Sequence, residues 1–379
     1  MILPSMRAHF QMPRDLCYLN AAYMTPLTLG QQAAGQGALA MNGTPWMVGP
    51  DDFFTTTEAI RGQGASIFNC TADDLAIVPA ASYGIATAAR NLPIEKGQAV
   101  LVLEGQFPSN VYEWRARTAE VGAELVTVAP PSDDDWTRAV LERVVALGDH
   151  LAIAALPHVH WSSGARLDLV AIGQAVRAAG GALVLDLTQS LGAMPFDAGA
   201  VDPDFAVAAG YKWLLGPYGM GLMYVAPRHQ HGTALEQNWI VRRDSEDFAG
   251  LVDYKDDYQP GARRFDVGER SNFILAPIFH EGLRQLLEWG VGNVAESLNA
   301  INTRLGAVAE AAGLGPIAES LRGPHMTGIH CGDRGPALLA ALKERGVSAS
   351  LRGQTLRLAP HLWIDEADEA RFEEAVKAL

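Results

Sequence analysis

The chain has 379 residues, of which 49% are hydrophobic and 19% are charged, and its formal net charge is −14 at pH 7. This length and composition fit a globular enzyme of two domains, or of one large α/β domain with an appendage. The negative charge argues against nucleic acid or an anionic membrane surface as a partner.

The N-terminal stretch MILPSMRAHFQMPRD has no long apolar core and no clear cleavage site, so we expect no signal peptide. No apolar run approaches the roughly 20 residues that span a bilayer. Cys17, Cys70 and Cys331 are widely separated, which argues against a disulfide framework and against a zinc site. Together these features predict a cytoplasmic protein.

The middle of the chain alternates short apolar runs with longer amphipathic stretches. Helical patterns cover 136–147 and 167–180. The runs typical of strands are QAVLVLE (98–104), AELVTVAP (123–130), HLAIAALPHV (150–159), GALVLDLTQ (181–189), DFAVAAGYK (204–212) and MGLMYVAP (220–227). This order predicts an α/β fold with βαβ units and a mostly parallel, buried sheet.

The last part of the chain has a different pattern. Residues 228–268 are richer in charge and weakly periodic, which indicates a connector, and 277–312 predict a long helical stretch with breaks at Gly290 and Gly292. Short strand patterns follow in HMTGIHC, VSASLR and TLRLAPHL, and DEADEARFEEAVKAL predicts an amphipathic terminal helix. We expect a smaller α+β domain here.

Polar residues end several of the predicted strands, at the sheet edge where α/β proteins bind ligands. Asp186 closes one strand, and Lys212 follows another in the apolar, glycine-containing stretch VAAGYKWLLGPYGMGLMYV. Burial without a partner lowers a lysine pKa and makes its amine a nucleophile towards aldehydes. A pyridoxal cofactor needs such a lysine for its Schiff base and an aspartate for its pyridine nitrogen. The alternatives are a lysine that extends into water and an aspartate that caps the turn after its strand.

A phosphate would need backbone donors at the start of a helix. PAASYGIATAARNL offers Ala81 and Ser82 at such a start, where N–H groups and the helix dipole favour an anion. The alternative, which is the commoner role of an isolated serine, is that Ser82 is an ordinary N-cap residue.

Motifs for other chemistries are absent or incomplete. The sequence contains no GxxxxGK[ST], and GMGLMY lacks the third glycine of a dinucleotide fingerprint. His158 and His160 form an HVH pair that could belong to a metal-dependent hydrolase, but no second ligand cluster accompanies them.

Two blocks of the sequence carry a specific resemblance. LPHVHWSSGARLDLVAIGQAVRAAGGALVLDLTQSLGAMPFD and DFAVAAGYKWLLGPYGMGLMYVAP resemble, in order and spacing, the class V aminotransferase family of fold-type I pyridoxal-phosphate enzymes. The resemblance extends from YLNAAYMTP to LRLAPHL, with kynureninases as the nearest well-known relatives and isopenicillin-epimerase-like members further away.

The resemblance implies pyridoxal 5′-phosphate as cofactor, a small amino acid as substrate, and a homodimer with its active site at the interface. It also implies an N-terminal arm (1–30) that contributes to the active site and to the small domain. A large cofactor-binding α/β domain (31–255) and a smaller C-terminal α+β domain (256–379) would follow.

Site roles follow from the same resemblance, position by position. Lys212 matches the catalytic Schiff-base lysine, and Tyr211 matches a tyrosine that reaches the phosphate. Asp186 matches the aspartate on the pyridine nitrogen, and Gln189 matches a residue near the phenolic oxygen.

Further positions match cofactor and substrate contacts. Ala81 and Ser82 match the residues that hold the phosphate. Phe107 falls where the family stacks a ring over the pyridine, although core packing is the alternative. Arg357 matches the arginine that binds the substrate α-carboxylate, a role suited to its planar fork.

Two softer matches, Trp239 and Asn272, resemble residues that complete the site, partly from the other subunit. For these two, a solvent-shielding tryptophan and a turn asparagine are equally good interpretations.

The sequence also departs from the family pattern. Trp161 stands where many relatives have a polar residue, Gly210 replaces a common phosphate-binding serine, and Glu269 stands where relatives carry a threonine. The loop around SLRGQTLR contains no cysteine, and Cys331 lies in an apolar strand pattern, so we reject a desulfurase.

The sequence therefore predicts an enzyme that acts on an amino acid through Lys212, with an aminotransferase favoured. A kynureninase-like lyase or an amino-acid epimerase is the alternative. A homologue that binds the cofactor but has lost turnover is the alternative from a different class.

Overall fold

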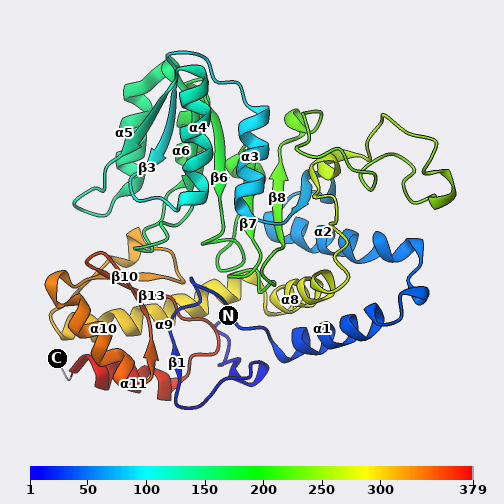
Figure 1. Ribbon diagram of the computed structural model, residues 1–379. Helices are drawn as coiled ribbons and strands as arrows, with labels where there is room; N and C mark the ends of the chain where they lie inside the picture. Colours follow the sequence, from blue (N-terminus) through cyan, green and yellow to red (C-terminus); the bar gives the residue numbers. More distant parts are fainter. Residues whose placement is uncertain (378–379) are drawn as a thin grey trace.

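A seven-stranded sheet forms the centre of the large domain in the computed structural model, which describes residues 1–377 (Figure 1). Its strand order is β2-β8-β7-β6-β5-β3-β4, and β8 runs antiparallel to both of its neighbours. The mostly parallel α/β fold is thus confirmed. The strands are β2 (Leu75–Val78), β3 (Ala99–Leu103), β4 (Glu124–Val128), β5 (Leu151–Pro157), β6 (Ala182–Asp186), β7 (Phe205–Ala209) and β8 (Gly221–Val225).

All six predicted strands of this sheet are confirmed, and the short edge strand β2 was not predicted. Helices cover both faces of the sheet, so neighbouring strand residues enter different cores: Val184 packs in one apolar cluster and Leu185 in the other. The helices of this domain are α1 (Leu29–Asn42), α2 (Thr55–Phe68), α3 (Ala81–Asn91), α4 (Tyr112–Val121), α5 (Trp136–Leu147), α6 (Leu169–Ala178), α7 (Ala198–Val201) and α8 (Leu275–Trp289).

The small domain is built on a four-stranded antiparallel sheet of order β12-β13-β10-β9. The N-terminal arm joins it, because β1 pairs in parallel with β11 (Figure 1). The strands are β1 (Cys17–Tyr18), β9 (Gly315–Pro316), β10 (Thr327–His330), β11 (Val347–Ser348), β12 (Ser350–Arg352) and β13 (Thr355–Leu358), and the helices are α9 (Val291–Ala311), α10 (Gly335–Glu344) and α11 (Glu366–Lys377). The predicted tail strands and terminal helix are confirmed within the described residues.

The break between α8 and α9 occurs at Gly290, whose φ of 78° ends one helix and starts the next. The predicted break at Gly292 is wrong. Because one left-handed residue already turns the chain, Gly292 lies in the first turn of α9.

The connector 228–268 is irregular apart from short 3-10 turns, and one of these turns packs against β2. Helix α8 packs against α1 and α2. We therefore propose that the boundary between the two domains lies at Gly290 instead of after residue 255.

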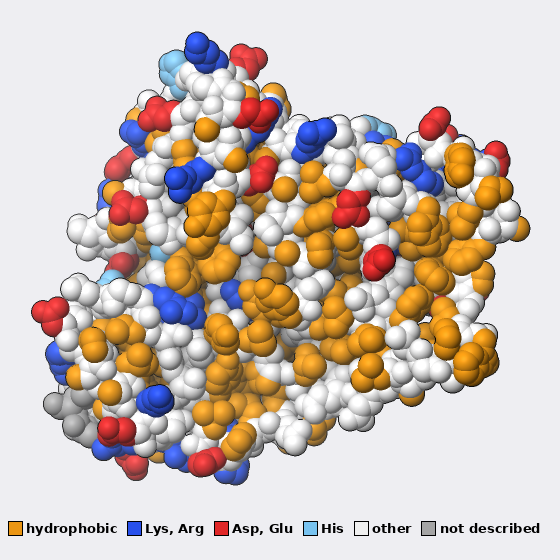
Figure 2. All heavy atoms as spheres, in the orientation of Figure 1, with side chains coloured by type: hydrophobic (Ala, Val, Ile, Leu, Met, Phe, Trp, Pro, Cys, Tyr) orange, Lys and Arg blue, Asp and Glu red, His pale blue; other side chains and the backbone are white. Residues whose placement is uncertain are grey.

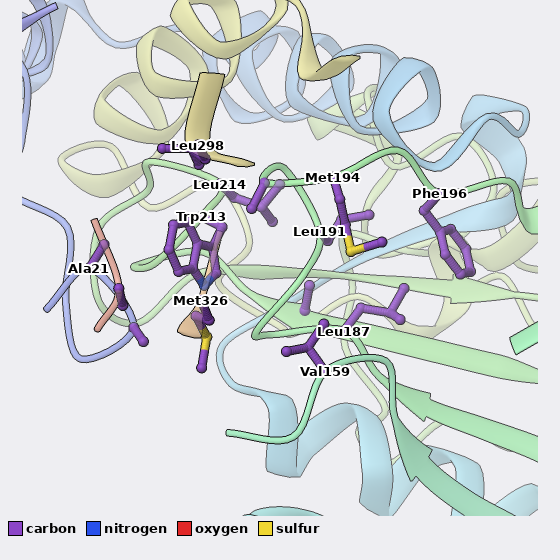
Figure 3. Packing of buried hydrophobic residues seen from close by; sticks show 14 of the residues in the cluster. Ala21, Val159, Leu187, Leu191, Met194, Phe196, Trp213, Leu214, Leu298 and Met326 are labelled. Atoms are coloured by element: carbon purple, nitrogen blue, oxygen red, sulfur yellow. The ribbon is translucent and has the colours of Figure 1, made fainter. Parts of the chain in front are cut away.

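One apolar core runs from the sheet into the small domain (Figure 3). Trp213, which follows Lys212, packs in the same cluster as Met326 before β10, Leu298 of α9 and Ala21 of the arm. This packing fixes the end of β7 against the other domain. No helix among residues 1–377 is long and apolar enough to cross a membrane.

Candidate active site

A narrow cleft lies at the carboxyl ends of the parallel strands. β5, β6 and β7 each end beside it, as expected for ligand sites in open α/β sheets. Its lining residues are Gln106, Phe107, Pro157, Val159, Trp161, Asp186, Thr188, Gln189 and Lys212. The structure thus brings four of the predicted site residues into one cleft.

Lys212 lies in the turn after β7 and is only 5% exposed. Its amine makes no hydrogen bond within the described chain and lies 5.4 Å from the ring centre of Phe107 and 5.3 Å from that of Tyr211. Burial lowers its pKa to about 8, while Asp186 opposes this shift and Arg357 and Arg352 add to it. A substantial fraction of this amine is therefore neutral near pH 8, as a nucleophile or base requires.

Asp186 is the last residue of β6 and is also buried. Burial raises the pKa of its carboxyl group, while hydrogen bonds from Thr188 and the charge of Lys212 lower it. The Thr188 N–H donates to Oδ1 at 3.0 Å, and the Thr188 hydroxyl in turn accepts from the Ala209 N–H. A cationic ring N–H in the cleft would supply the partner that this carboxylate lacks.

Helix α3 begins at Ala81, with Ser82 exposed in its first turn. Its N-cap residue is Ala80, which provides no side-chain cap, so Ser82 is not the N-cap. The N–H groups of Ala81 and Ser82 therefore have no partner among the described residues and are available to an anion, whereas the Tyr83 N–H bonds the Ala80 carbonyl. α3 packs against β7, the strand that positions Lys212.

Aromatic side chains form the walls of the cleft. Phe107 meets Trp161 edge-on with ring centres 5.6 Å apart, and the Trp161 indole donates to the Gly105 carbonyl at 2.7 Å. Tyr211 packs against Tyr218. Gly210, where relatives have a serine, has no room for a side chain, because a Cβ there would meet the Met220 carbonyl at 2.7 Å.

The Gln189 side chain lines the cleft, but both ends of its amide bond the protein. It accepts from the Trp213 indole at 3.0 Å and donates to the Ala22 carbonyl at 3.1 Å. The amide of Gln189 is thus held in place by the arm and by the residue after Lys212.

Arg357 approaches the site from β13 of the small domain and is 1% exposed. Its Nη1 donates to the Trp161 carbonyl at 2.6 Å and its Nη2 to Asn20 Oδ1 at 3.1 Å, whereas Nε is buried without a partner. Burial lowers its pKa to about 10. The edge of the guanidinium that carries Nε–H is therefore left without an acceptor, and such an edge is suited to binding a carboxylate.

Sequence reasoning missed two residues of this half of the site, Asn20 and Arg352. The Arg352 guanidinium lies 5.3 Å from the ring centre of Trp161. Figure 2 shows basic side chains in the hollow between the two domains. The hairpin pattern of SLRGQTLR, with arginines on both strands, was the available signal.

Trp239 and Asn272 lie together, but in a different cleft, which they share with Phe53 and Glu269. Trp239 packs against Phe53 and Phe248, and Asn272 Oδ1 accepts from the Leu275 N–H at the start of α8. Within one chain the structure does not bring them to Lys212.

The histidines and cysteines take other positions. His158 packs edge-on against Phe196, and His160 stacks on Trp136. Among residues 1–377 no group of three or more His, Cys, Asp or Glu side chains is placed to hold a metal ion. No cysteine lines the Lys212 cleft, and Cys331 is buried with its thiol against the Gln354 carbonyl.

Comparisons with known proteins agree with this geometry. The family described as Aminotransferase class-V matches residues 51–237. An uncharacterized aminotransferase of Bacillus subtilis, YcbU, is 27% identical over 86% of this chain and 83% of its own length. A kynureninase of Deinococcus radiodurans is 28% identical over 69% of this chain and 63% of its own length, so the match spans less than two thirds of that enzyme.

Solved structures show the same fold. The cystine C–S lyase C-DES, in complex with cysteine persulfide, has a TM-score of 0.82 at 18% identity, covering 96% of this chain and 97% of its own. An apo cysteine desulfurase of Thermococcus onnurineus has a TM-score of 0.78 at 15% identity over the whole of both chains.

The matched segment contains the whole of the strand-end site, from Ser82 to Lys212. The chain belongs to the class V aminotransferase family and has the fold-type I architecture. The cofactor of this family is pyridoxal 5′-phosphate, and the residues present fit it: an unbonded amine, a buried carboxylate facing the same cleft, and an uncapped helix start.

Proposed function

We propose that the protein is an aminotransferase that acts on a small amino acid. The observation that carries the proposal is the cleft that both the buried Lys212 and the buried Asp186 line, beside which Arg357 of the small domain donates to the carbonyl of the lining residue Trp161.

Four residues of the large domain would hold the cofactor, and one of them would also act as the base. Lys212 would hold the cofactor covalently through Nζ, and its free amine would remove and return the substrate α-proton. Asp186 would accept a hydrogen bond from the pyridine N–H, and the N–H groups of Ala81 and Ser82, with the Ser82 hydroxyl, would bind the phosphate. The bound cofactor supplies an electron-withdrawing ring that stabilises negative charge at the substrate Cα.

Three further residues act by shape and charge. Phe107 and Trp161 cover the cleft and limit access of water to the reacting carbon. Arg357 binds the substrate α-carboxylate, since its Nε–H edge is free while its other donors are fixed by Trp161 and Asn20.

A kynureninase-like lyase is the second candidate. The observation that favours it is the Tyr211–Lys212 pair beside an aromatic-walled cleft, together with the similarity to kynureninases. We assign to the half-buried Tyr211 the handling of a proton on the departing fragment, and its partial burial raises the pKa of its hydroxyl.

The cofactor-loaded protein distinguishes these candidates when single amino acids are added one at a time under a visible-absorbance readout. An aminotransferase converts the cofactor to its pyridoxamine form and releases a 2-oxo acid. A lyase regenerates the original spectrum and releases a fragment. If no amino acid changes the spectrum, the proposed function is wrong.

We also propose a homodimer in which Trp239 and Asn272 complete the site of the second copy, because they form their own cleft away from Lys212. Light scattering measures the mass. Mixing inactive Lys212→Ala with inactive Asn272→Ala should restore about a quarter of the activity if the two copies share sites, and none if each chain is complete alone.

A further inference from the structure

Trp161 is the meeting point of two arginines from one hairpin of the small domain. Arg357 of β13 donates to its carbonyl at 2.6 Å, and the guanidinium of Arg352 of β12 lies over its ring at 5.3 Å. Trp161 itself lines the Lys212 cleft. Both guanidinium groups therefore contact the same residue of the cleft wall.

The strand register places these groups on one face. Ser350 pairs with Arg357 across the hairpin, so their side chains project on the same side of the sheet. Arg352 follows Ser350 by two residues in the same strand and shares that face. The Ser350 hydroxyl and Arg357 Nη2 both bond Asn20 Oδ1, which fixes this face against the arm.

This pair of cations has no counter-charge. Within residues 1–377, neither Arg352 nor Arg357 forms an ion pair with a carboxylate, and each has a buried Nε without a partner. The positive charge of Arg352 lowers the pKa of both Lys212 and Arg357. A chain with a net charge of −14 thus concentrates unpaired positive charge at one place. The missing partner is an anion that arrives with the ligand.

One substrate carboxylate can pair with one of the two guanidinium groups, and a second carboxylate would pair with the other. We propose that the substrate is an acidic amino acid, whose α-carboxylate binds Arg357 and whose side-chain carboxylate binds Arg352 above Trp161. This inference rests on the proposed function and narrows its substrate class.

Binding of carboxylic acids without an amino group tests the inference independently of turnover. Isothermal titration calorimetry on the cofactor-loaded protein compares glutarate with pentanoate, and succinate with butanoate, which differ only in the second carboxylate. We expect the better diacid to bind at least about tenfold more tightly than its monoacid, as a charge-assisted hydrogen bond predicts.

Arg352→Gln should abolish this preference and leave the affinity for the monoacid unchanged, and Arg352→Lys should retain part of the preference. Arg334→Gln is the matched control, because Arg334 is an exposed arginine of the same domain that bonds only backbone carbonyls. It should change nothing.

Three outcomes overturn the inference. They are equal or absent binding of diacid and monoacid by the unaltered protein, a diacid preference that survives Arg352→Gln, and an equal loss of both ligands, which would mean that the two arginines share one carboxylate. A protein that responds spectrally to neutral amino acids but shows no diacid preference keeps the proposed function and loses this inference.

Discussion

The two halves of the cleft are built differently. The large-domain half, with Asp186 and Lys212, stands at the ends of parallel strands that are buried and continuous with the core. The small-domain half, with Arg352 and Arg357, stands on a short hairpin held by Asn20 of the arm and by Trp161. We propose that the large-domain half carries out the chemistry and that the small-domain half selects the substrate; they are called the chemical half and the selecting half below.

Removal of the lysine tests the chemical half most strongly. Lys212→Ala should lower turnover by at least about a thousandfold, because the variant loses both the covalent attachment and the base. The visible band of the lysine-bound cofactor should disappear, whereas the far-ultraviolet circular dichroism should not change. A variant that keeps this band would contradict the assignment of Lys212.

The pH dependence of cofactor attachment tests the lowered pKa of Lys212 in the chemical half. Burial lowers the Lys212 pKa from 10.5 to about 8, so the fraction of neutral amine rises with pH and levels off above pH 8. The rate of attachment of pyridoxal to the apoprotein, corrected with Lys212→Ala for other lysines, should rise roughly 50-fold from pH 6 to pH 8. A continued rise towards pH 10 would show that the amine is solvated.

Neutralising Arg357 tests the selecting half. Arg357→Gln should raise KM for the amino acid roughly 20-fold while kcat changes little, because it removes a charged partner of the α-carboxylate. Steady-state kinetics gives both parameters, with Arg334→Gln as the control. A fall in kcat at constant KM would place Arg357 in the chemical half.

The smallest effect is expected from a substitution at Ser82, which would contact the cofactor phosphate. Ser82→Ala should weaken cofactor binding about fivefold, since the exposed Ser82 hydroxyl is lost as a donor to the phosphate while the backbone donors of α3 remain. Equilibrium dialysis against pyridoxal phosphate measures this, and Ser82→Thr should restore the affinity. Full affinity in Ser82→Ala would leave the backbone as the only anchor.

The same division explains what the sequence could predict. Strands β3 to β8 were found because continuous apolar runs between helical patterns are typical of buried parallel strands. Their end residues, Asp186 and Lys212, could then be placed at one edge without knowledge of the tertiary structure. The edge strand β2 was missed, because four apolar residues before a helix carry little pattern.

The selecting half could not be placed in this way. Asn20, Trp161 and Arg352 come from three distant segments, and only the packing of the hairpin against the arm brings them together. Gln189 was placed at the cleft, but the sequence could not show that Trp213 and Ala22 occupy its amide. The prediction of a helix break at Gly292 was wrong because a glycine does not by itself end a helix.

The core around Trp213 has a consequence for how the molecule unfolds. Trp213 follows Lys212 directly, packs edge-on against His325, and shares one apolar cluster with Met326 and Leu298 of the small domain. Loosening the small domain would therefore remove support from the turn that holds the lysine. We expect the two domains to melt in a single cooperative transition, with a substitution such as Met326→Ala lowering the melting temperature of both together.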